Sequence, residues 1–178
     1  MLKKLALLSI VIGMGVVLAG KVCAEPLTAA MCKAKAIEAA KMIEAEGAAG
    51  FAKLKDPAAG FRFGDNNAGH IWVHDSKNVM RAHPVKPEME GTSCAEMKDV
   101  KGSYFIVNMT DLVMEKNAGW VTYSWPKPGK QDVSPKASYV VKAVNGGETF
   151  VVGSGLYDVT AADIKKEFPS DPIVDGTE

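Results

Sequence analysis

Hydrophobic and polar residues follow two different periods along the chain, and each period predicts one kind of element. Apolar side chains recur at the spacing of one helix face among lysines and glutamates near the N-terminus and again in mid-chain. Thr160, with Asp163 three residues later, is typical of a helix cap. We expect helices over residues 27–46, 103–117 and 161–168, with a further helical turn near 50–55.

Alternation with a period of two residues predicts strands in the remaining segments. We expect strands over residues 70–75, 79–84, 120–126, 137–144 and 149–156. The turn Asn145-Gly146-Gly147 joins the last two as a hairpin. The order of one helix, two strands, one helix, three strands and a last helix predicts one mixed α/β (α+β) domain with a long N-terminal helix packed on an antiparallel sheet.

The first predicted hairpin has two unlike faces. If Ser76 and Lys77 form a two-residue loop, Trp72 lies opposite Arg81 and His70 lies opposite His83 on one face. The other face carries Ile71, Val73, Met80 and Ala82 and is expected to pack on the N-terminal helix. An ordinary solvated outer face remains the alternative for the basic and aromatic side.

The stretch GWVTYSWPKPGK, residues 119–130, places Tyr123 and Trp125 on one strand face and Trp120 on the other. Two aromatic side chains with polar tips are suited to line a cavity. Spacing alone favours ordinary core aromatics whose polar atoms find backbone partners.

The N-terminal residues have the pattern of a secretory signal peptide. Two early lysines precede an apolar run from Leu5 to Ala19, and small residues precede Glu25. The run is shorter than the roughly 18 apolar residues of a membrane span. We therefore expect residues 1–24 to be removed and residues 25–178 to be periplasmic or secreted, with an uncleaved anchor as the alternative.

Composition narrows the class of protein. The 178 residues, 47% of them hydrophobic, suffice for one domain, and the formal net charge of zero disfavours a nucleic-acid binder that relies on a broad basic surface. Removal of the signal peptide leaves Cys32 and Cys94 as the cysteines, and an oxidising compartment predicts a disulfide between them. Two buried free thiols are the alternative.

Several segments, taken in order, resemble the single Cache domain family, type 2. They are the long N-terminal helix, Gly-Ala-Ala-Gly-Phe-Ala-Lys-Leu, the hairpin ending Arg-Ala-His-Pro, Gly-Trp-Val-Thr-Tyr-Ser-Trp-Pro, Pro-Lys-Ala-Ser-Tyr-Val and Gly-Ser-Gly-Leu-Tyr-Asp. The likeness runs from Leu27 to about Asp158, and a short C-terminal helix and tail follow it. It implies a PAS-like extracytoplasmic sensor fold of the kind found in chemoreceptors and histidine kinases, with the long helix on one sheet face and a ligand pocket on the other.

The resemblance also implies a ligand class and a site. Such domains bind small organic molecules, often short carboxylates, and the matching positions at the pocket are His83, Tyr123, Trp125 and Lys136. Strand facing and the general layout of the family add Arg81, Trp72 and Tyr104. A buried carboxylate needs a counter-charge and hydrogen-bond donors, which lysine, histidine and tyrosine supply. For Lys136 alone, a solvated strand end is the other interpretation.

We expect a ligand-binding sensor domain that acts through a membrane receptor or histidine kinase, because no segment after residue 168 is apolar enough to span a membrane. A ligand-buffering or metal-binding protein is the alternative, with His70, His74, His83 and Asp75 as candidate metal ligands. His70 and His74 would lie roughly 13 Å apart in an extended strand, too far for one ion. Neither a Ser-His-Asp nor a Cys-His pattern supports an enzyme, no cofactor is expected, and the oligomeric state stays open.

Overall fold

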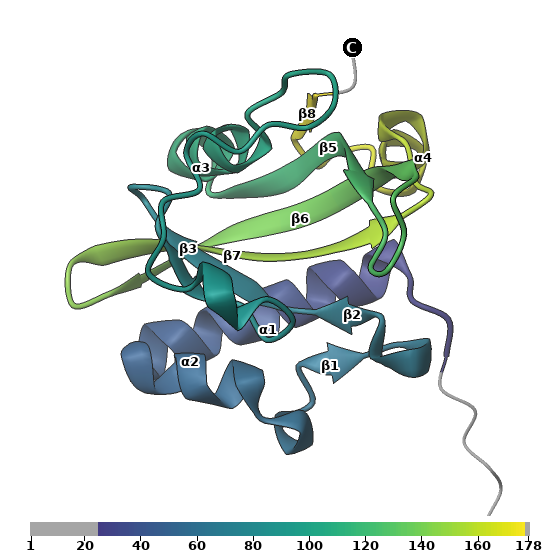
Figure 1. Cartoon of the computed structure of the whole chain (residues 1–178). Coiled ribbons are helices and arrows are strands. Elements are labelled where there is room, and N and C mark those ends of the chain that lie inside the picture. The colour runs from purple at the N-terminus through teal and green to yellow at the C-terminus, as the bar shows by residue number, and fades with distance from the viewer. Residues whose placement is uncertain (1–24, 177–178) are drawn as a thin grey trace, which may run out of the picture.

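The computed structural model describes residues 25–176, in which helices cover both faces of a twisted sheet (Figure 1). The α-helices are α1 (Ala29–Glu46), α2 (Ala48–Lys55), α3 (Phe105–Lys116) and α4 (Ala161–Glu167), and the short 3-10 turns are η1 (Pro57–Ala59), η2 (Asp65–Asn67) and η3 (Pro87–Met89). The strands are β1 (Arg62–Phe63), β2 (Gly69–His70), β3 (Trp72–Asp75), β4 (Met80–Ala82), β5 (Ala118–Pro126), β6 (Val133–Asn145), β7 (Glu148–Tyr157) and β8 (Ile173–Asp175). The mixed fold predicted from the sequence is confirmed.

The main sheet has six strands in the order β4-β3-β7-β6-β5-β8. All neighbouring strands are antiparallel except β5 and β8, which run parallel. Asn145 pairs with Glu148, so the β6–β7 hairpin closes on Gly146 and Gly147, both at positive φ, as the glycine pair predicts. Strands β1 and β2 pair separately beside the main sheet.

Helix α1 covers one face of the sheet. The Thr28 side chain caps its first turn by accepting a hydrogen bond from the Met31 amide at 3.2 Å. Its buried side is built from alanines together with Cys32 and Ile43, and these small side chains let the helix axis approach β6 and β7 closely. The face of the sheet under α1 is therefore filled with packed side chains.

Helix α3 covers part of the opposite face (Figure 1). Met109, Leu112 and Val113 are buried there against Val121 and Val140 of the sheet. The helix ends at Asn117, which adopts the left-handed conformation common at helix C-termini. Helix α3 has only 12 residues, and its first residue, Phe105, lies over Tyr123 of β5.

The predicted register of the first hairpin is wrong. Val73 pairs with Ala82 and His74 pairs with Met80, so Arg81 is the extra residue of a β-bulge. The bulge turns the Arg81 side chain to Asp75, with Nε to Oδ2 at 2.9 Å. Met80 consequently packs on the α3 side of the sheet, not with α1 as expected. The sequence pattern assumed strict alternation, which a bulge interrupts.

The predicted disulfide is also wrong. Cys32 and Cys94 are both free and buried. Cys32 belongs to the core under α1, whereas Cys94 belongs to the core under α3, so the sheet separates the two thiols. A disulfide requires Cα atoms within about 7 Å, which residues on opposite faces of a sheet do not satisfy.

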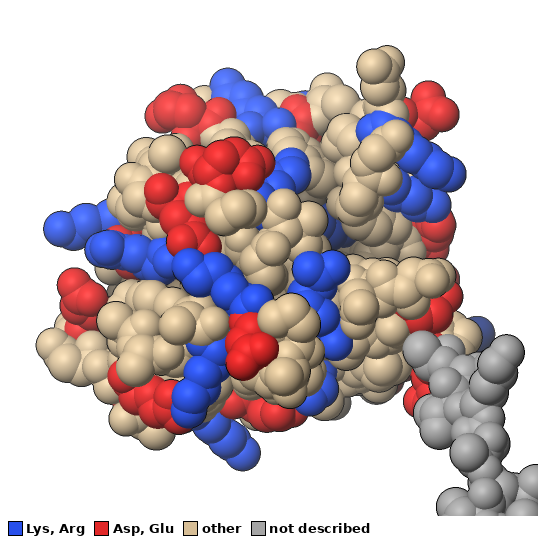
Figure 2. Space-filling view, turned by 60° about the horizontal axis from the view of Figure 1, so that its bottom comes forward, with Lys and Arg blue, Asp and Glu red and all other residues tan. Residues whose placement is uncertain are grey.

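The expected signal peptide lies outside the described residues. Within residues 25–176, no helix is both long and apolar enough to cross a bilayer. Figure 2 shows basic and acidic side chains interleaved over one face of the molecule, in agreement with the zero net charge. This face offers no broad basic surface of the kind that nucleic-acid binding needs.

Candidate functional site

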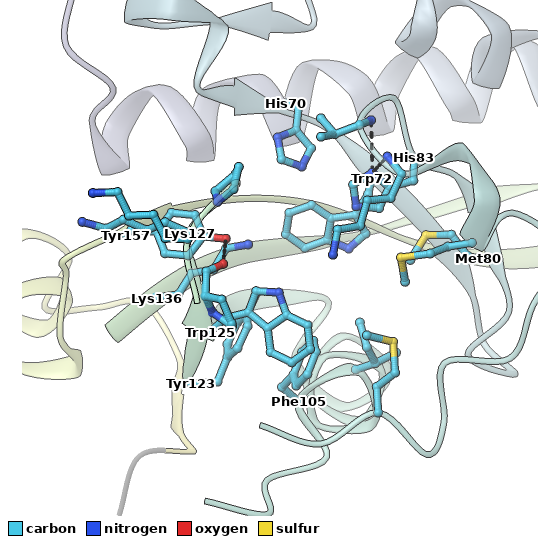
Figure 3. Close-up of a pocket in the computed structure, with 18 of the residues that line it drawn as sticks. His70, Trp72, Met80, His83, Phe105, Tyr123, Trp125, Lys127, Lys136 and Tyr157 are labelled. Carbon is cyan, nitrogen blue, oxygen red and sulfur yellow. Dashed lines mark hydrogen bonds between the residues drawn. The ribbon is translucent and has the colours of Figure 1, made fainter. Parts of the chain in front are cut away.

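A cavity of about 300 Å³ lies on the α3 side of the sheet, bordered by the loops 83–98 and 126–130 (Figure 3). Its aromatic lining consists of Trp72, Phe105, Tyr123, Trp125 and Tyr157, and its basic lining consists of His70, His83, Lys86, Lys127, Lys130 and Lys136. Methionines and other apolar side chains supply the rest. None of the described residues that line it is acidic, so the cavity favours an anion.

Three adjacent strands place one lysine between two tyrosines at the base of the cavity. Lys136 of β6 pairs with Tyr123 of β5 on one side and with Tyr157 of β7 on the other. Cross-strand partners point to the same sheet face, so all three side chains enter the cavity together. The register of the long β5–β6–β7 meander thus assembles this part of the site.

The Lys136 ammonium is buried among aromatic rings (Figure 3). It lies 4.8 Å from the ring centroid of Tyr157 and 5.6 Å from those of Trp72 and Tyr123. The Tyr157 hydroxyl beside it donates to the Pro126 carbonyl at 3.0 Å. Burial lowers the pKa of Lys136, and no Asp or Glu in the described part of the chain forms an ion pair with it.

Trp72 forms a wall of the cavity because a glycine lies beneath it. Trp72 of β3 pairs with Gly153 of β7, and a Cβ atom at position 153 would lie 2.4 Å from Cζ2 of the indole. The ring therefore lies flat against the sheet. Its Nε1–H is buried and has no hydrogen-bond partner, which leaves a donor available at the cavity.

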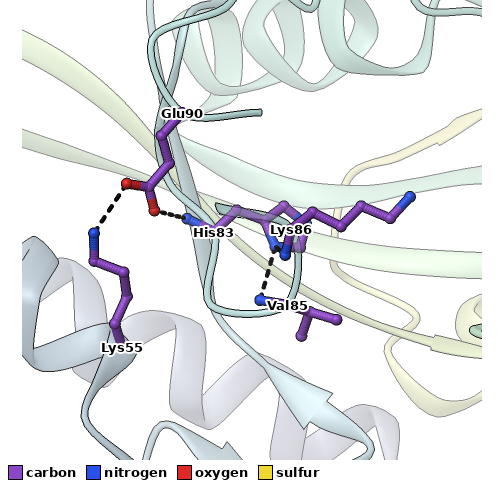
Figure 4. Close-up of polar contacts among 5 residues, drawn as sticks. All are labelled: Lys55, His83, Val85, Lys86 and Glu90. Atoms are coloured by element: carbon purple, nitrogen blue, oxygen red, sulfur yellow. Dashed lines mark hydrogen bonds and ion pairs between the residues drawn. The ribbon is translucent and has the colours of Figure 1, made fainter. Parts of the chain in front are cut away.

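The hydrogen bonds of His83 fix which of its ring nitrogens carries the proton. Nδ1 accepts from the amides of Val85 at 3.3 Å and Lys86 at 3.2 Å, so the neutral ring carries its proton on Nε2. The His83 amide donates to Glu90, and Glu90 forms an ion pair with Lys55 of α2 (Figure 4). The loop is thus tied to the helix behind it, and the imidazole presents a donor.

His70 and His83 stand side by side, with ring centroids 5.2 Å apart. Burial, together with the positive charge of Lys136, lowers the pKa of His83 to about 4 and that of His70 to about 3. Both imidazoles are therefore neutral at pH 7. The buried base of the cavity thus holds one cation, Lys136, and two neutral rings, which suits a single carboxylate group.

Tyr123 and Trp125 line the cavity together with Phe105 of α3. Phe105 stacks on Tyr123 with centroids 4.4 Å apart and meets Trp125 at 4.9 Å. The Tyr123 hydroxyl hydrogen-bonds Ser138 at 3.0 Å, so Tyr123 contributes its ring more than its polar tip. Trp120 lies on the other face, where its Nε1–H donates to Asp171.

The structure brings together five of the seven candidate ligand-binding residues. Trp72, His83, Tyr123, Trp125 and Lys136 all line the cavity. Arg81 is turned away by the bulge and is held by Asp75, and the exposed ring of Tyr104 lies near Lys98 instead. Both lie outside the cavity lining.

Sequence reasoning missed several lining residues. His70 was placed beside His83 but not assigned to the site, although the two rings adjoin. Tyr157 was visible only in the segment Gly-Ser-Gly-Leu-Tyr-Asp, whose pairing with β6 places it beside Lys136. Phe105 and three methionines carry no motif, and their roles follow from tertiary packing.

The metal alternative finds no geometric support. In the part of the chain that the structure describes, no group of three or more His, Cys, Asp or Glu side chains could hold a metal ion. His74 points to α3, where Nε2 lies 3.1 Å from the Thr110 hydroxyl, and Asp75 holds Arg81. Of the candidate metal ligands, His74 and Asp75 therefore serve separate structural contacts, whereas His70 and His83 line the cavity.

Comparison with known proteins identifies the family and related sensor domains. The family model Single Cache domain 2 matches residues 27–168. Methyl-accepting chemotaxis protein McpP of Pseudomonas putida is 30% identical over 99 residues, which is 56% of this chain and 17% of that receptor. The chain thus spans about a sixth of the length of that relative.

Two solved structures are similar over most of their length. A Cache chemosensory domain, described in terms of carboxylic acid recognition, is 30% identical with a TM-score of 0.56, covering 71% of this chain and 86% of its own. A periplasmic sensor domain of a chemotaxis protein is 27% identical with a TM-score of 0.57, covering 73% and 92%.

Proposed function

The chain belongs to the single Cache domain 2 family, and from this premise we propose that its cavity binds a small carboxylate and that the domain acts in chemical sensing. The proposal accords with the chemotaxis receptors and the carboxylic acid-recognising domain to which the chain is similar. The residues proposed to bind the ligand are Trp72, His83, Tyr123, Trp125 and Lys136.

The observation that carries this proposal is the buried ammonium of Lys136. A buried charge is costly unless it is paired, and aromatic faces compensate only part of the lost hydration. Lys136 has aromatic neighbours and one hydroxyl but no carboxylate partner among residues 25–176. A ligand carboxylate would supply the missing counter-charge.

Two further hydrogen-bond donors at the cavity also favour a carboxylate ligand. Nε2–H of His83 and Nε1–H of Trp72 belong to residues that line the cavity with Lys136, and the second has no protein partner. A carboxylate has two oxygens with about four acceptor positions and would use such donors. Hydrogen bonds to a charged acceptor contribute roughly 1.5–3 kcal/mol each, so loss of either donor should be measurable.

A thermal-shift screen of acids, amides and amines tests the proposal. We expect monocarboxylates to raise the melting temperature of the wild-type protein, whereas the matching amides and amines do not, because they lack the negative charge that Lys136 requires. Calorimetric titration then gives the affinity. Absence of a shift with every acid, or equal shifts with the matching amides, would reject carboxylate binding.

His83→Asn tests the proposed donor in the same assay. Asparagine keeps an acceptor near Nδ1 for the two backbone amides but withdraws the donor at Nε2. We expect binding about 10- to 100-fold weaker with a small change in stability. Arg81→Asn is the matched control, because Arg81 lies outside the cavity, and its affinity should equal that of the wild type.

The affinity for carboxylates should fall at alkaline pH earlier than an ordinary lysine would predict. Burial lowers the pKa of Lys136 below its usual 10.5, and only the protonated form attracts the anion. As pH rises through this lowered pKa, the affinity should drop by up to tenfold per pH unit. Titrations at several pH values measure this, and constant affinity up to and beyond pH 10.5 would contradict a role for Lys136.

We further propose that a membrane receptor or histidine kinase reads the bound state, outside the cytoplasm. The support is the similarity to sensor domains of chemotaxis proteins, one of them periplasmic. We also propose that the cavity binds its ligand unchanged and does not catalyse a reaction. Incubation of the purified protein with an acid that saturates the cavity, followed by recovery of the intact acid, tests the proposed absence of catalysis.

A further inference from the structure

We propose that the acid carries an apolar chain or ring of about five to eight carbons, so that acetate and propionate are poor ligands. This inference rests on the proposed function, since it concerns the other end of the same cavity. It depends on how polar and apolar groups are divided between the two ends and on the volume between them.

The polar groups gather at one end of the cavity. The His70 and His83 rings adjoin with centroids 5.2 Å apart, and the His70 ring and the Lys136 ammonium both lie near the Trp72 ring, at 6.2 Å and 5.6 Å from its centroid. Figure 3 shows Lys136 and Tyr157 on one side of Trp72 and Met80 on the other. A carboxylate held at the polar end would therefore point the rest of the ligand toward the apolar end.

The apolar end is lined by six side chains: Met80, Met89, Met97, Phe105, Ile106 and Trp125. They belong to one hydrophobic cluster under α3 or pack directly against it. Among these six, only the Trp125 indole carries an N–H, and Lys86 lies over its ring at 5.9 Å near the loop. Water at this end gains few hydrogen bonds, so an apolar ligand group would displace it favourably.

The volume sets the size of the ligand. A cavity of about 300 Å³ corresponds to about ten water molecules at a liquid share of about 30 Å³ each, and hence to a ligand of about ten non-hydrogen atoms. Acetate would fill less than half of this space and would leave the methionines in contact with water. Hexanoate, benzoate or phenylacetate would occupy both ends.

The three methionines at the apolar end should allow the cavity to accept ligands whose apolar groups differ in shape. Methionine is unbranched and flexible, and its thioether packs well against aromatic rings and adapts to irregular partners. Met80, Met89 and Met97 come from β4, η3 and the loop before α3, so they can adjust separately. We therefore expect linear and aromatic tails of equal size to bind with similar affinity, while chain length is strongly distinguished.

A homologous series of linear acids from acetate to octanoate tests the inference by calorimetric titration of the wild-type protein. Each added CH₂ buries apolar surface and should tighten binding about fourfold, up to hexanoate or heptanoate, after which affinity should level off or fall. Affinity that is independent of chain length, or tightest for acetate, would overturn the inference while leaving carboxylate binding intact. If no acid binds, the proposed function fails and the inference fails with it.

The Met97→Trp variant tests whether the apolar tail of the acid, the part beyond its carboxylate, lies at the apolar end of the cavity. The larger side chain should fill the apolar end and weaken hexanoate binding at least tenfold while leaving propionate binding nearly unchanged. Met114→Trp makes the same replacement on the exposed surface of α3, where Met114 is 51% exposed, and should change neither affinity. Equal losses for both acids in Met97→Trp, with the far-UV circular dichroism unchanged, would place the tail elsewhere and overturn the inference.

Discussion

Replacing Lys136 with methionine is expected to abolish acid binding and, at the same time, to raise the melting temperature of the unliganded protein. Methionine fills a similar volume, but it cannot pair with a carboxylate, and loss of a buried charge partner costs about 2–5 kcal/mol of binding, at least about 30-fold in Kd. The unliganded protein no longer has to bury an unpaired ammonium. The gain should be about 1–3 kcal/mol, since the rings and the Tyr157 hydroxyl already offset part of the penalty.

The pH dependence of stability distinguishes this explanation from better packing. The folded-state pKa of Lys136 is lowered, so the unfolded chain binds more protons between that pKa and 10.5, and wild-type stability should rise with pH in this window. The stability difference between Lys136→Met and wild type should therefore narrow toward pH 10. A difference that stays constant with pH would show that the ammonium is not the cause.

Lys142→Met provides the matched control. Lys142 lies six residues further along β6, on the same sheet face but outside the cavity lining. Its replacement should leave acid binding intact. Chemical denaturation measures the stability of the two variants, and titration with the acid measures their affinity. Loss of binding in both variants would mean that a change in strand β6, and not the loss of the cavity charge, abolishes binding.

Gly153→Ala is expected to destabilise the protein by about 1–3 kcal/mol and to weaken acid binding at least tenfold. The new Cβ would lie 2.4 Å from Cζ2 and 2.6 Å from Cε2 of Trp72, so the indole must leave its position against the sheet. The displaced ring would enter the cavity and move its Nε1–H. Thermal unfolding, near-UV circular dichroism and acid titration measure the three effects.

A double-mutant cycle assigns the effect to the indole. Trp72→Phe shortens the side chain at the atoms that would collide, so adding it to Gly153→Ala should recover about 1 kcal/mol or more of stability. Gly50→Ala is the control for glycine replacement, because its Cβ would make only ordinary contacts at 3.5 Å and should be neutral or mildly stabilising. Additive losses in the double variant would contradict the proposed collision.

The sequence predicted the elements well where local signals and periodicity agree. The long α1, the hairpin turn at Gly146-Gly147 and the cap of α4 at Thr160 are all present. The position of Arg81 was not predictable, because a bulge depends on which contacts the neighbouring strand offers and leaves no period of its own. Strand β8 was missed because its three residues are too few for a pattern.

The candidate site also contains both residues that the sequence could predict and residues that it could not. Tyr123 and Lys136 could be predicted from facing and family motif, since a register in a long meander is locally determined. The unsatisfied Nε1–H of Trp72 depends on Gly153, which is distant in sequence, and no spacing reveals it. The cysteine pairing failed for the same reason, because the sequence counts thiols but does not say which side of the sheet each one occupies.

The two faces of strand β5 contact different parts of the molecule. Tyr123 and Trp125 line the cavity, whereas Trp120 holds Asp171, and Thr122 bonds Asp175 of β8 at 2.7 Å. Selection for ligand chemistry would then act on one set of alternate positions, and selection for the C-terminal segment on the other. Among related domains that have changed ligand, we expect substitutions at positions 123 and 125 to accompany the change, while those at 120 and 122 track residues 171–175.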